Sequence, residues 1–141
     1  MSDFVIDASV ALKWVVDEDG TKEALTLRRA RLFAPDLINV ECANILWKKA
    51  RLGQLSAEEA LFAGRLLANA DMALTPTRLL LEPSIALAIQ LDHPAYDCAY
   101  LALAEAKDIA FVTADSRLVR KVQSIDRFKG RLMDLRDVPA I

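Results

Sequence analysis

Short apolar runs alternate along the chain with longer segments in which apolar residues recur at helical spacing. The short runs predict buried strands, which we place at residues 4–6, 32–34, 72–74, 109–113 and 131–135. The longer segments predict helices, which we place at residues 8–16, 21–31, 37–51, 56–70, 79–91, 95–107 and 116–123. Strands and helices therefore alternate from one end of the chain to the other.

Several residues mark the ends of these helices. Thr21, Asp36 and Ser56 stand where a side-chain oxygen can cap a helix. Gly53 can end the helix at 37–51. Pro83 must lie in the first turn of its helix or kink it.

The alternation indicates an α/β fold with a central, mostly parallel sheet, because parallel strands need crossover connections that place helices on both faces. The 141 residues suit one domain, spanning residues 1–141. Hydrophobic residues make up 54% of the chain, which is above the usual share for soluble domains. We therefore expect a core of ordinary size and some apolar surface left for a partner.

The charge and the cysteines exclude several classes of protein. A net charge of −2 gives no overall attraction for nucleic acid, so local basic residues or bound metal would have to hold a polyanion. Two cysteines and one histidine cannot supply a four-ligand zinc site of the usual spacing, and we interpret Cys42 and Cys98 as small buried thiols. No secretory signal and no apolar run of membrane-spanning length is visible. We expect a cytoplasmic protein with no membrane contact.

Four acidic residues are placed so that their carboxylates point to one end of the predicted sheet. Asp7 follows the first strand and Asp115 follows the strand at 109–113, and the carboxyl ends of parallel strands meet at one edge. Asp97 lies in the first turn of the helix at 95–107, and Glu41 lies on an otherwise apolar part of the helix at 37–51. We interpret these acids together as one candidate site.

Each acid taken alone has an ordinary structural explanation. Asp7 and Asp115 could cap the helices that follow them. Asp97 could interact favourably with the positive end of its helix dipole. Glu41 could form a weak surface ion pair with Lys48. Their joint occurrence is not explained in this way, because gathered carboxylates repel one another and lose solvation.

A divalent cation would relieve that repulsion. Mg²⁺ and Mn²⁺ take oxygen ligands and keep several waters, so a few carboxylates suffice. Such a cluster suits metal-assisted phosphoryl transfer. Nearby polar side chains could orient the carboxylates or a water molecule; these are Ser9, Asn44, Thr113 and Ser116.

The ordered acids carry a resemblance to a known family. Asp7 stands in Ile-Asp-Ala-Ser and Glu41 in Val-Glu-Cys-Ala-Asn, followed by YDCAYLALA at 96–104 and FVTADSR at 111–117. Together these settings resemble PIN-domain proteins, and among them the VapC toxins of bacterial toxin–antitoxin pairs. The resemblance covers residues 3 to about 135, and the ordered set carries it, since no single motif is specific.

The resemblance implies a three-layer α/β/α PIN-like fold and a Mg²⁺- or Mn²⁺-dependent endoribonuclease that cleaves RNA with metal-activated water. It implies that Asp7, Glu41, Asp97 and Asp115 form the catalytic quartet. Asp7, Asp97 and Asp115 would hold the metal, and Glu41 would complete the pocket. The polar residues named above would support these acids.

The resemblance also implies partners, namely a second copy of the chain in a homodimer and a VapB-type antitoxin. Operator DNA would be reached only through that antitoxin. Most of the large apolar residues are interpreted as core, and some as the lining of a groove for an antitoxin helix; they are Leu12, Trp14, Leu46, Trp47 and the face at 61–67.

Basic residues near the acids are candidates for contact with RNA phosphates. Arg117, Arg120 and Lys121 follow the last acid directly, and Lys48 is a second choice. The ordinary alternative is a solvated face. His93 sits in a turn beside a proline, and we interpret it as structural.

Three other functions fit parts of the sequence. A phosphatase of the haloacid-dehalogenase type needs an acid two residues after the first one, where this chain has Ser9. A receiver domain needs a lysine after a late strand, where residues 113–115 read Thr-Ala-Asp. A PIN scaffold that only binds an antitoxin belongs to a different class, which nuclease assays with titrated metal would separate from an enzyme.

Overall fold

A computed structural model describes residues 2–139; residue 1 and residues 140–141, which the expected domain includes, lie outside the described residues. Within residues 2–139, parallel strands form one sheet in the order β3-β2-β1-β4-β5. The strands are β1 (Asp3–Ile6), β2 (Arg31–Pro35), β3 (Ala73–Thr75), β4 (Ala110–Thr113) and β5 (Leu132–Asp134). Each expected strand is present, and every recorded pairing between strands is parallel.

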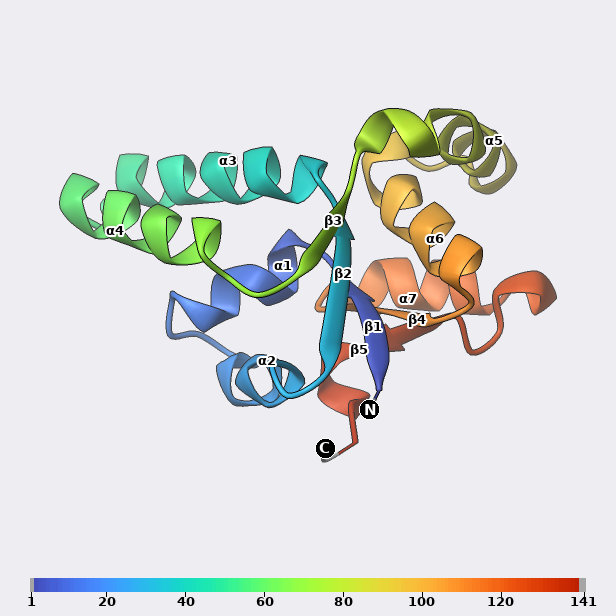
Figure 1. Ribbon diagram of the computed structural model, residues 1–141, viewed down its shortest axis with the longest axis horizontal. Coiled ribbons are helices and arrows are strands. Elements are labelled where there is room, and N and C mark those ends of the chain that lie inside the picture. Colours follow the sequence, from blue (N-terminus) through green and yellow to red (C-terminus); the bar gives the residue numbers. More distant parts are fainter. Residues whose placement is uncertain (1, 140–141) are drawn as a thin grey trace.

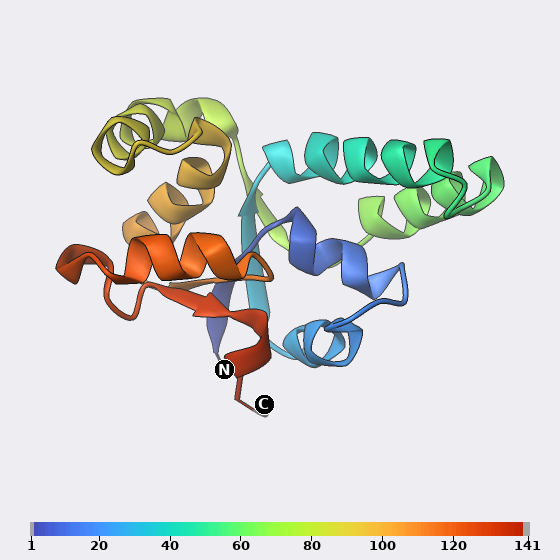
Figure 2. The ribbon, with the colours of Figure 1, turned by 180° about the vertical axis from the view of Figure 1, so that it is seen from behind.

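Helices flank the sheet on two sides (Figure 1). One side carries α1 (Ala8–Ala11), α2 (Thr21–Leu27), α3 (Leu37–Arg51) and α4 (Ala57–Ala68), and the other carries α5 (Leu81–Leu91), α6 (Ala95–Lys107) and α7 (Ser116–Gln123). The opposite view brings α7 and β5 to the front (Figure 2). Short 3₁₀ turns lie at Leu12–Trp14, Thr77–Leu80, Asp126–Phe128 and Leu135–Asp137. The division of the helices between the two faces follows from right-handed crossover connections. The connections that lead into β2 and β3 run across the sheet in one direction, and those that lead into β4 and β5 run in the opposite direction.

Helix α6 is the central helix of the core. All residues from 98 to 104 are buried, and the helix packs against β1, β2 and β4. Tyr100 stacks on Phe111 of β4 with ring centroids 5.5 Å apart. The small side chains of Ala99, Ala102 and Ala104 let the helix approach the sheet closely. This packing places the first turn of α6, with its acid, beside the carboxyl ends of the strands.

Helices α3 and α4 form a pair that projects away from the sheet (Figure 1). The sequence places their ends correctly. Gly53, just after α3, has a φ of 74°, which glycine adopts without strain. At the start of α4, Ser56 Oγ accepts from Glu59 N at 3.0 Å, and Glu59 Oε1 accepts from Ser56 N at 2.8 Å. This reciprocal capping box satisfies N–H groups that the helix cannot pair itself.

Two expected helices end at least four residues before the predicted position, whereas the bounds of the other helices differ from the prediction by two residues or fewer. The helix expected over residues 8–16 ends as an α-helix at Ala11 and continues only as a 3₁₀ turn. The helix expected over residues 21–31 ends at Leu27, because the backbone N–H of Arg31 donates to Ser2 O and its side chain pairs with Asp3 of β1. Pairing in the sheet therefore prevails over local helix preference at this boundary.

Two expected caps are also wrong. Thr21 is the first residue of α2, after Gly20 at the cap position, and its hydroxyl accepts from Glu18 N. Asp36 makes no side-chain bond to α3; its Oδ1 accepts from the backbone and hydroxyl of Thr77. These oxygens hold loops in place, which sequence spacing alone does not reveal. Pro83 lies in the first turn of α5, as expected.

The sheet has its topological switch point between β1 and β4. The chain leaves β1 towards β2 on one side and leaves β4 towards β5 on the other. Ligand sites of open α/β sheets lie at the carboxyl ends of strands at such a point. Asp7 follows β1, and Thr113 ends β4, so the fold brings the sequence-predicted acids to the expected edge.

Large apolar side chains are exposed on two surfaces. The first surface lies on α3 and α4 and includes Val40, Trp47, Leu61, Phe62 and Leu66. The second surface lies on and beside α5 and includes Leu79, Leu81, Ile85, Ile89 and Tyr96. Of the residues interpreted as core or as the lining of a groove, Leu12 and Leu46 are buried in the core, and Trp14 packs against it partly buried. Trp47 and most of the 61–67 face are exposed and do not belong to the core. Among the described residues, no helix is long and apolar enough to cross a bilayer.

Candidate functional site

Asp7 is a buried carboxylate held by residues of two neighbouring segments. Its Oδ1 accepts from Ser9 Oγ at 2.5 Å and from Val10 N at 3.3 Å. Its Oδ2 accepts from Thr113 Oγ1, at the end of β4, at 2.6 Å. Ser9 Oγ in turn accepts from Ala114 N at 3.0 Å. The first carboxylate is therefore fixed jointly by the turn after β1 and the end of β4, as the interpretation of Ser9 and Thr113 as supporting residues requires.

The protonation of Asp7 reflects its surroundings. Burial raises the pKa of Asp7 to about 6, the hydrogen bonds from Ser9 and Thr113 oppose that rise, and the charge of Asp97 adds to it. Asp97 lies in the first turn of α6. The two carboxylates therefore interact electrostatically although 90 positions separate them in the sequence.

Glu41 reaches the same region from α3. Burial is the main cause that raises its pKa above the ordinary value, and the charge of Asp97 adds to the rise. The hydroxyl of Tyr100, on α6, donates to Glu41 Oε1 at 2.5 Å and opposes the rise. The partner of Glu41 is thus a buried tyrosine. The alternative of a surface ion pair would require Lys48 as the partner.

Asp97 is held from the side by His93. The ring Nε2 of His93 lies 2.6 Å from Asp97 Oδ2, four residues apart along the chain. The other ring nitrogen, Nδ1, lies 3.3 Å from Lys121 Nζ of α7, which also donates to Asp92 O at 2.9 Å. His93 therefore contacts the candidate site directly.

Asp115 and Ser116 have different surroundings from the other members of the predicted site. Asp115 is exposed and caps α7, its Oδ1 accepting from Arg117 N and Leu118 N at 3.1 Å. Ser116 Oγ donates to Asp134 Oδ2 at 2.6 Å, so it orients a carboxylate at the end of β5. Asp134 also accepts from the guanidinium of Arg136.

The remaining sequence-predicted residues lie around the acids. Asn44 is exposed on α3, one turn after Glu41, and makes no side-chain hydrogen bond within the described residues. The candidates for phosphate contact are all exposed; they are Lys48, Arg117, Arg120 and Lys121. The structure therefore links Asp7, Glu41 and Asp97 electrostatically, with Asp115 at the start of the adjacent helix.

The oxygen donors fit a hard divalent cation that keeps part of its water shell. Within residues 2–139, no three His, Cys, Asp or Glu side chains converge tightly enough to ligate an ion by themselves. Mg²⁺ needs no such cage, because it is held through one or two carboxylates and keeps several waters. The raised pKa values of Asp7 and Glu41 reflect desolvation and negative charge that a bound cation would offset.

Comparisons with known proteins agree with this geometry. A family model described as PIN domain matches residues 4–123, and the chain belongs to the PIN-domain family. "Ribonuclease VapC9" from Mycobacterium tuberculosis is 36% identical over 119 residues, which cover 81% of this chain and 87% of that protein. "Ribonuclease VapC3" from Pyrobaculum aerophilum is 33% identical over 125 residues, which cover 86% of this chain and 95% of that protein. The resemblance to VapC proteins is thereby confirmed.

A solved structure supports the fold independently. The crystal structure of PAE2754 from Pyrobaculum aerophilum superposes with a TM-score of 0.68 at 21% identity, covering 96% of this chain and 90% of that chain. The PIN-like α/β fold expected from the sequence is confirmed.

Two residues of the site were missed by sequence reasoning. Tyr100 lies in an apolar helix and has no role of its own in the site that the sequence predicts. Its spacing of three from Asp97 nevertheless places both residues on one helix face. His93 was assigned to a turn, although its spacing of four from Asp97 permits a contact. In both cases the spacing was visible, but it does not reveal the direction of the side chain.

We predict that Tyr100→Phe raises the pKa of Glu41 further. The substitution keeps the stacked ring and removes the hydroxyl that favours the charged carboxylate. The pKa of Glu41 is measured by carboxyl ¹³C NMR titration of the metal-free protein. Tyr96→Phe, at an exposed tyrosine on the same helix, is the matched control and leaves that pKa unchanged. An unaltered Glu41 titration in Tyr100→Phe would show that the hydrogen bond does not control this carboxylate.

Proposed function

We propose that this protein is a Mg²⁺- or Mn²⁺-dependent endoribonuclease and the toxin of a type II toxin–antitoxin pair. The observation that carries the proposal is the buried carboxylate of Asp7 at the switch point, electrostatically coupled to Asp97. A protein gathers like charges at such an edge when a cation is to be held there. Membership of the PIN-domain family and the two relatives named as VapC ribonucleases support the same reaction.

In this proposal each acid has a defined task. Asp7 and Asp97, whose charges interact, hold the cation directly. Asp115, at the start of α7, acts on it through a water molecule, and Glu41 completes the pocket. A bound Mg²⁺ or Mn²⁺ supplies Lewis acidity, lowers the pKa of water and offsets charge on the phosphate. Ser9 and Thr113 keep both oxygens of Asp7 oriented, which holds the site ready before substrate arrives.

Exposed cations are proposed to hold the RNA backbone. Arg117 and Arg120 project from the helix that Asp115 caps, and Lys48 lies on α3 after Glu41. Guanidinium and ammonium groups contact phosphate oxygens without reading sequence. Lys121 was a further candidate, but its ammonium already donates to Asp92 O, so we place it last. The cytoplasmic location expected from the sequence stays a prediction.

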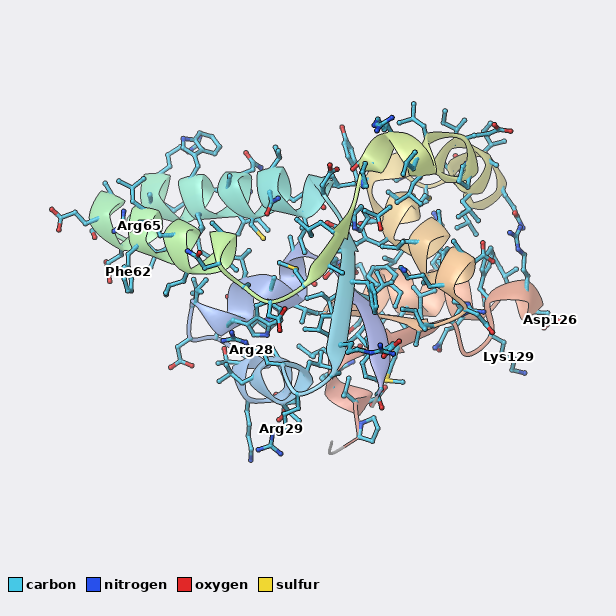
Figure 3. The ribbon with its side chains drawn as sticks, viewed as in Figure 1. Arg28, Arg29, Phe62, Arg65, Asp126 and Lys129 are labelled. Carbon is cyan, nitrogen blue, oxygen red and sulfur yellow. The ribbon has the colours of Figure 1, made fainter. Side chains whose placement is uncertain are left out.

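The antitoxin is proposed to bind the groove between α3 and α4. This groove has a volume of about 410 Å³ and is lined by apolar residues, among them Leu46, Leu67 and Leu74, and by Gly64. Trp47 of α3 and Phe62 of α4 are further exposed apolar side chains on the same two helices, and Figure 3 shows Phe62 with Arg65 projecting from α4. An amphipathic helix fits such a groove by laying its apolar face into it. A VapB-type antitoxin, which would also carry the contact with operator DNA, is the occupant we propose.

A second copy of the chain is proposed to cover α5. Leu81, Ile85 and Ile89 are exposed at intervals of four residues and therefore form one apolar row. Beside them lies a hollow of about 150 Å³ bordered by Tyr96. Within the described residues, Ser84 Oγ in this hollow is buried and has no hydrogen-bond partner. A symmetric contact would cover the row and give that hydroxyl an acceptor.

The rival functions lack such support. A haloacid-dehalogenase phosphatase needs a second acid where Ser9 donates to Asp7. A scaffold that only binds a partner has no need for a buried carboxylate that raises the free energy of folding. The catalytic reading is therefore preferred.

We predict that Asp7→Asn reduces RNA cleavage by about a hundredfold or more, because one cation-holding carboxylate worth several kcal/mol of transition-state stabilisation is lost. Cleavage of RNA is measured against Mn²⁺ and Mg²⁺ concentration, together with growth arrest on expression. Asp17→Asn, at an exposed acid outside the site, is the control and keeps full activity. Circular dichroism confirms that both variants fold. Full RNA cleavage by Asp7→Asn would contradict the proposal that Asp7 holds the catalytic cation.

We predict that Gly64→Arg weakens antitoxin binding at least about tenfold, or about 1.4 kcal/mol. A Cβ at Gly64 meets no atom within 4 Å, and glycine is unfavourable inside a helix, so the variant folds while its side chain fills the groove. Affinity for the neighbouring antitoxin is measured by calorimetry. Ala106→Arg, at an exposed position of α6, is the control. Equal affinities for both variants would place the antitoxin elsewhere.

We predict that Ile89→Glu converts a dimer into a monomer. Ile89 is 77% exposed in the single chain, so the substitution removes no core packing and puts a charge into the proposed contact. Sedimentation equilibrium gives the dissociation constant. Leu25→Glu, at an exposed leucine of α2, carries the same charge change and leaves the association intact. A wild-type chain that sediments as a monomer contradicts the proposed dimer.

A further inference from the structure

His93 lies between an acid of the candidate site and a lysine of another helix. Its Nε2 is 2.6 Å from Asp97 Oδ2, and its Nδ1 is 3.3 Å from Lys121 Nζ. Its side chain is only 17% exposed. The turn before α6 holds the ring there, with Asp92 in the left-handed region at a φ of 49° and Asp92 O accepting from Lys121 at 2.9 Å.

The lysine decides where the imidazole carries its proton. An ammonium group has donors and no acceptor, so His93 Nδ1 can take part in this contact only through its lone pair. The proton must then be on Nε2, which faces Asp97. Because the tautomer of a histidine is set by the hydrogen bond at its other nitrogen, Lys121 makes His93 a donor to the carboxylate.

This donor affects only one oxygen of Asp97. Oδ2 accepts from His93, while Oδ1 accepts no hydrogen bond from the described residues. A carboxylate held by one oxygen presents the other in a fixed direction, which favours a cation that needs defined geometry.

We propose that His93 is a positioning residue for the cation site: held in the Nε2–H form by Lys121, it orients Asp97 so that the free oxygen faces the ion. The inference rests on the proposed function, because it assumes that Asp97 binds a divalent cation. It also gives Lys121 a task other than contact with RNA.

If the role of His93 were only structural, its contact with Asp97 would serve to fasten the turn at 92–94 to α6. A contact with that purpose needs no particular tautomer of His93 and no lysine. The contact instead joins the turn, α6 and α7, and the start of α7 carries Asp115. The three-residue chain thus joins α6, which carries Asp97, to α7, whose N-terminal cap is Asp115.

The first test reads the tautomer directly. His93 is the only histidine of the chain, so the long-range ¹H–¹⁵N spectrum of the untagged, metal-free protein is assigned without ambiguity. We expect the Nε2–H form in the wild type and a loss of that preference in Lys121→Met. Arg120→Met, which removes a charge from the same helix, keeps the wild-type form. An Nδ1–H form in the wild type would overturn the inference.

The second test measures the dissociation constant for Mn²⁺ by electron paramagnetic resonance of the free ion, without RNA. We expect His93→Ala to weaken binding by about 10–100-fold, the usual effect of losing a residue that orients a metal ligand. His93→Gln, whose amide can still donate, restores most of the affinity. Thermal unfolding of the metal-free variants reports any loss of fold separately.

The Lys121→Met variant gives a third test, because the direction of its change in Mn²⁺ affinity separates two explanations. Loss of a nearby positive charge by itself strengthens the binding of a cation. Weaker Mn²⁺ binding in Lys121→Met, with Arg120→Met equal to or tighter than the wild type, therefore supports action through His93. Equal Mn²⁺ affinities for the wild type, His93→Ala and Lys121→Met would overturn the inference about His93 and leave the proposed function intact. A wild-type protein that binds no Mn²⁺ and cleaves no RNA would overturn the proposed function as well.

Discussion

The burial of one carboxylate at the carboxyl end of β1 constrains the rest of the site. Asp7 is only 7% exposed, and a buried charge is unfavourable unless hydrogen bonds compensate it. The donors come from Ser9 beside it and from Thr113 on the neighbouring strand. The register that pairs Ile6 with Val112 places Thr113 within reach. The pairing of β1 with β4 and the protonation of Asp7 therefore depend on each other.

Every acid of the quartet has its own donor, and each donor comes from a different part of the fold. The hydroxyls beside the switch point hold Asp7, Tyr100 holds Glu41, and His93 holds Asp97, while backbone N–H groups of α7 hold Asp115. These donors fix the directions of the oxygens, and none of the recorded side-chain donors is an arginine or lysine that would neutralise them. The region consequently retains the negative charge that attracts a cation and that the proposed function needs.

The two apolar surfaces lie on opposite sides of the sheet. Helices α3 and α4 extend to one side and α5 lies on the other (Figure 1). The proposed antitoxin and the proposed second copy would therefore occupy separate surfaces, so that one contact leaves the other accessible. Partners at these two surfaces would explain why large apolar side chains are exposed in the single chain.

The sequence by itself determined the order of elements and the identity of the acids. Helical spacing placed α3, α6 and α7 at their observed bounds, because their apolar positions and flanking breaks are local signals. It also placed Asp7 and Asp115 at one edge, since parallel strands end together. The ends of α1 and α2 were missed. After α2, the contacts of Arg31 with Ser2 and with Asp3 of β1 draw the chain into the sheet.

Only the tertiary structure decided which side chains meet. Tyr100 reaches Glu41 across 59 positions, and Lys121 reaches His93 across 28; no local pattern encodes such pairs. The same holds for exposure, because Leu46 and Trp47 are neighbours in the sequence of α3, yet Leu46 is buried and Trp47 is exposed. Sequence spacing defines a face of a helix, but packing in three dimensions decides what that face contacts.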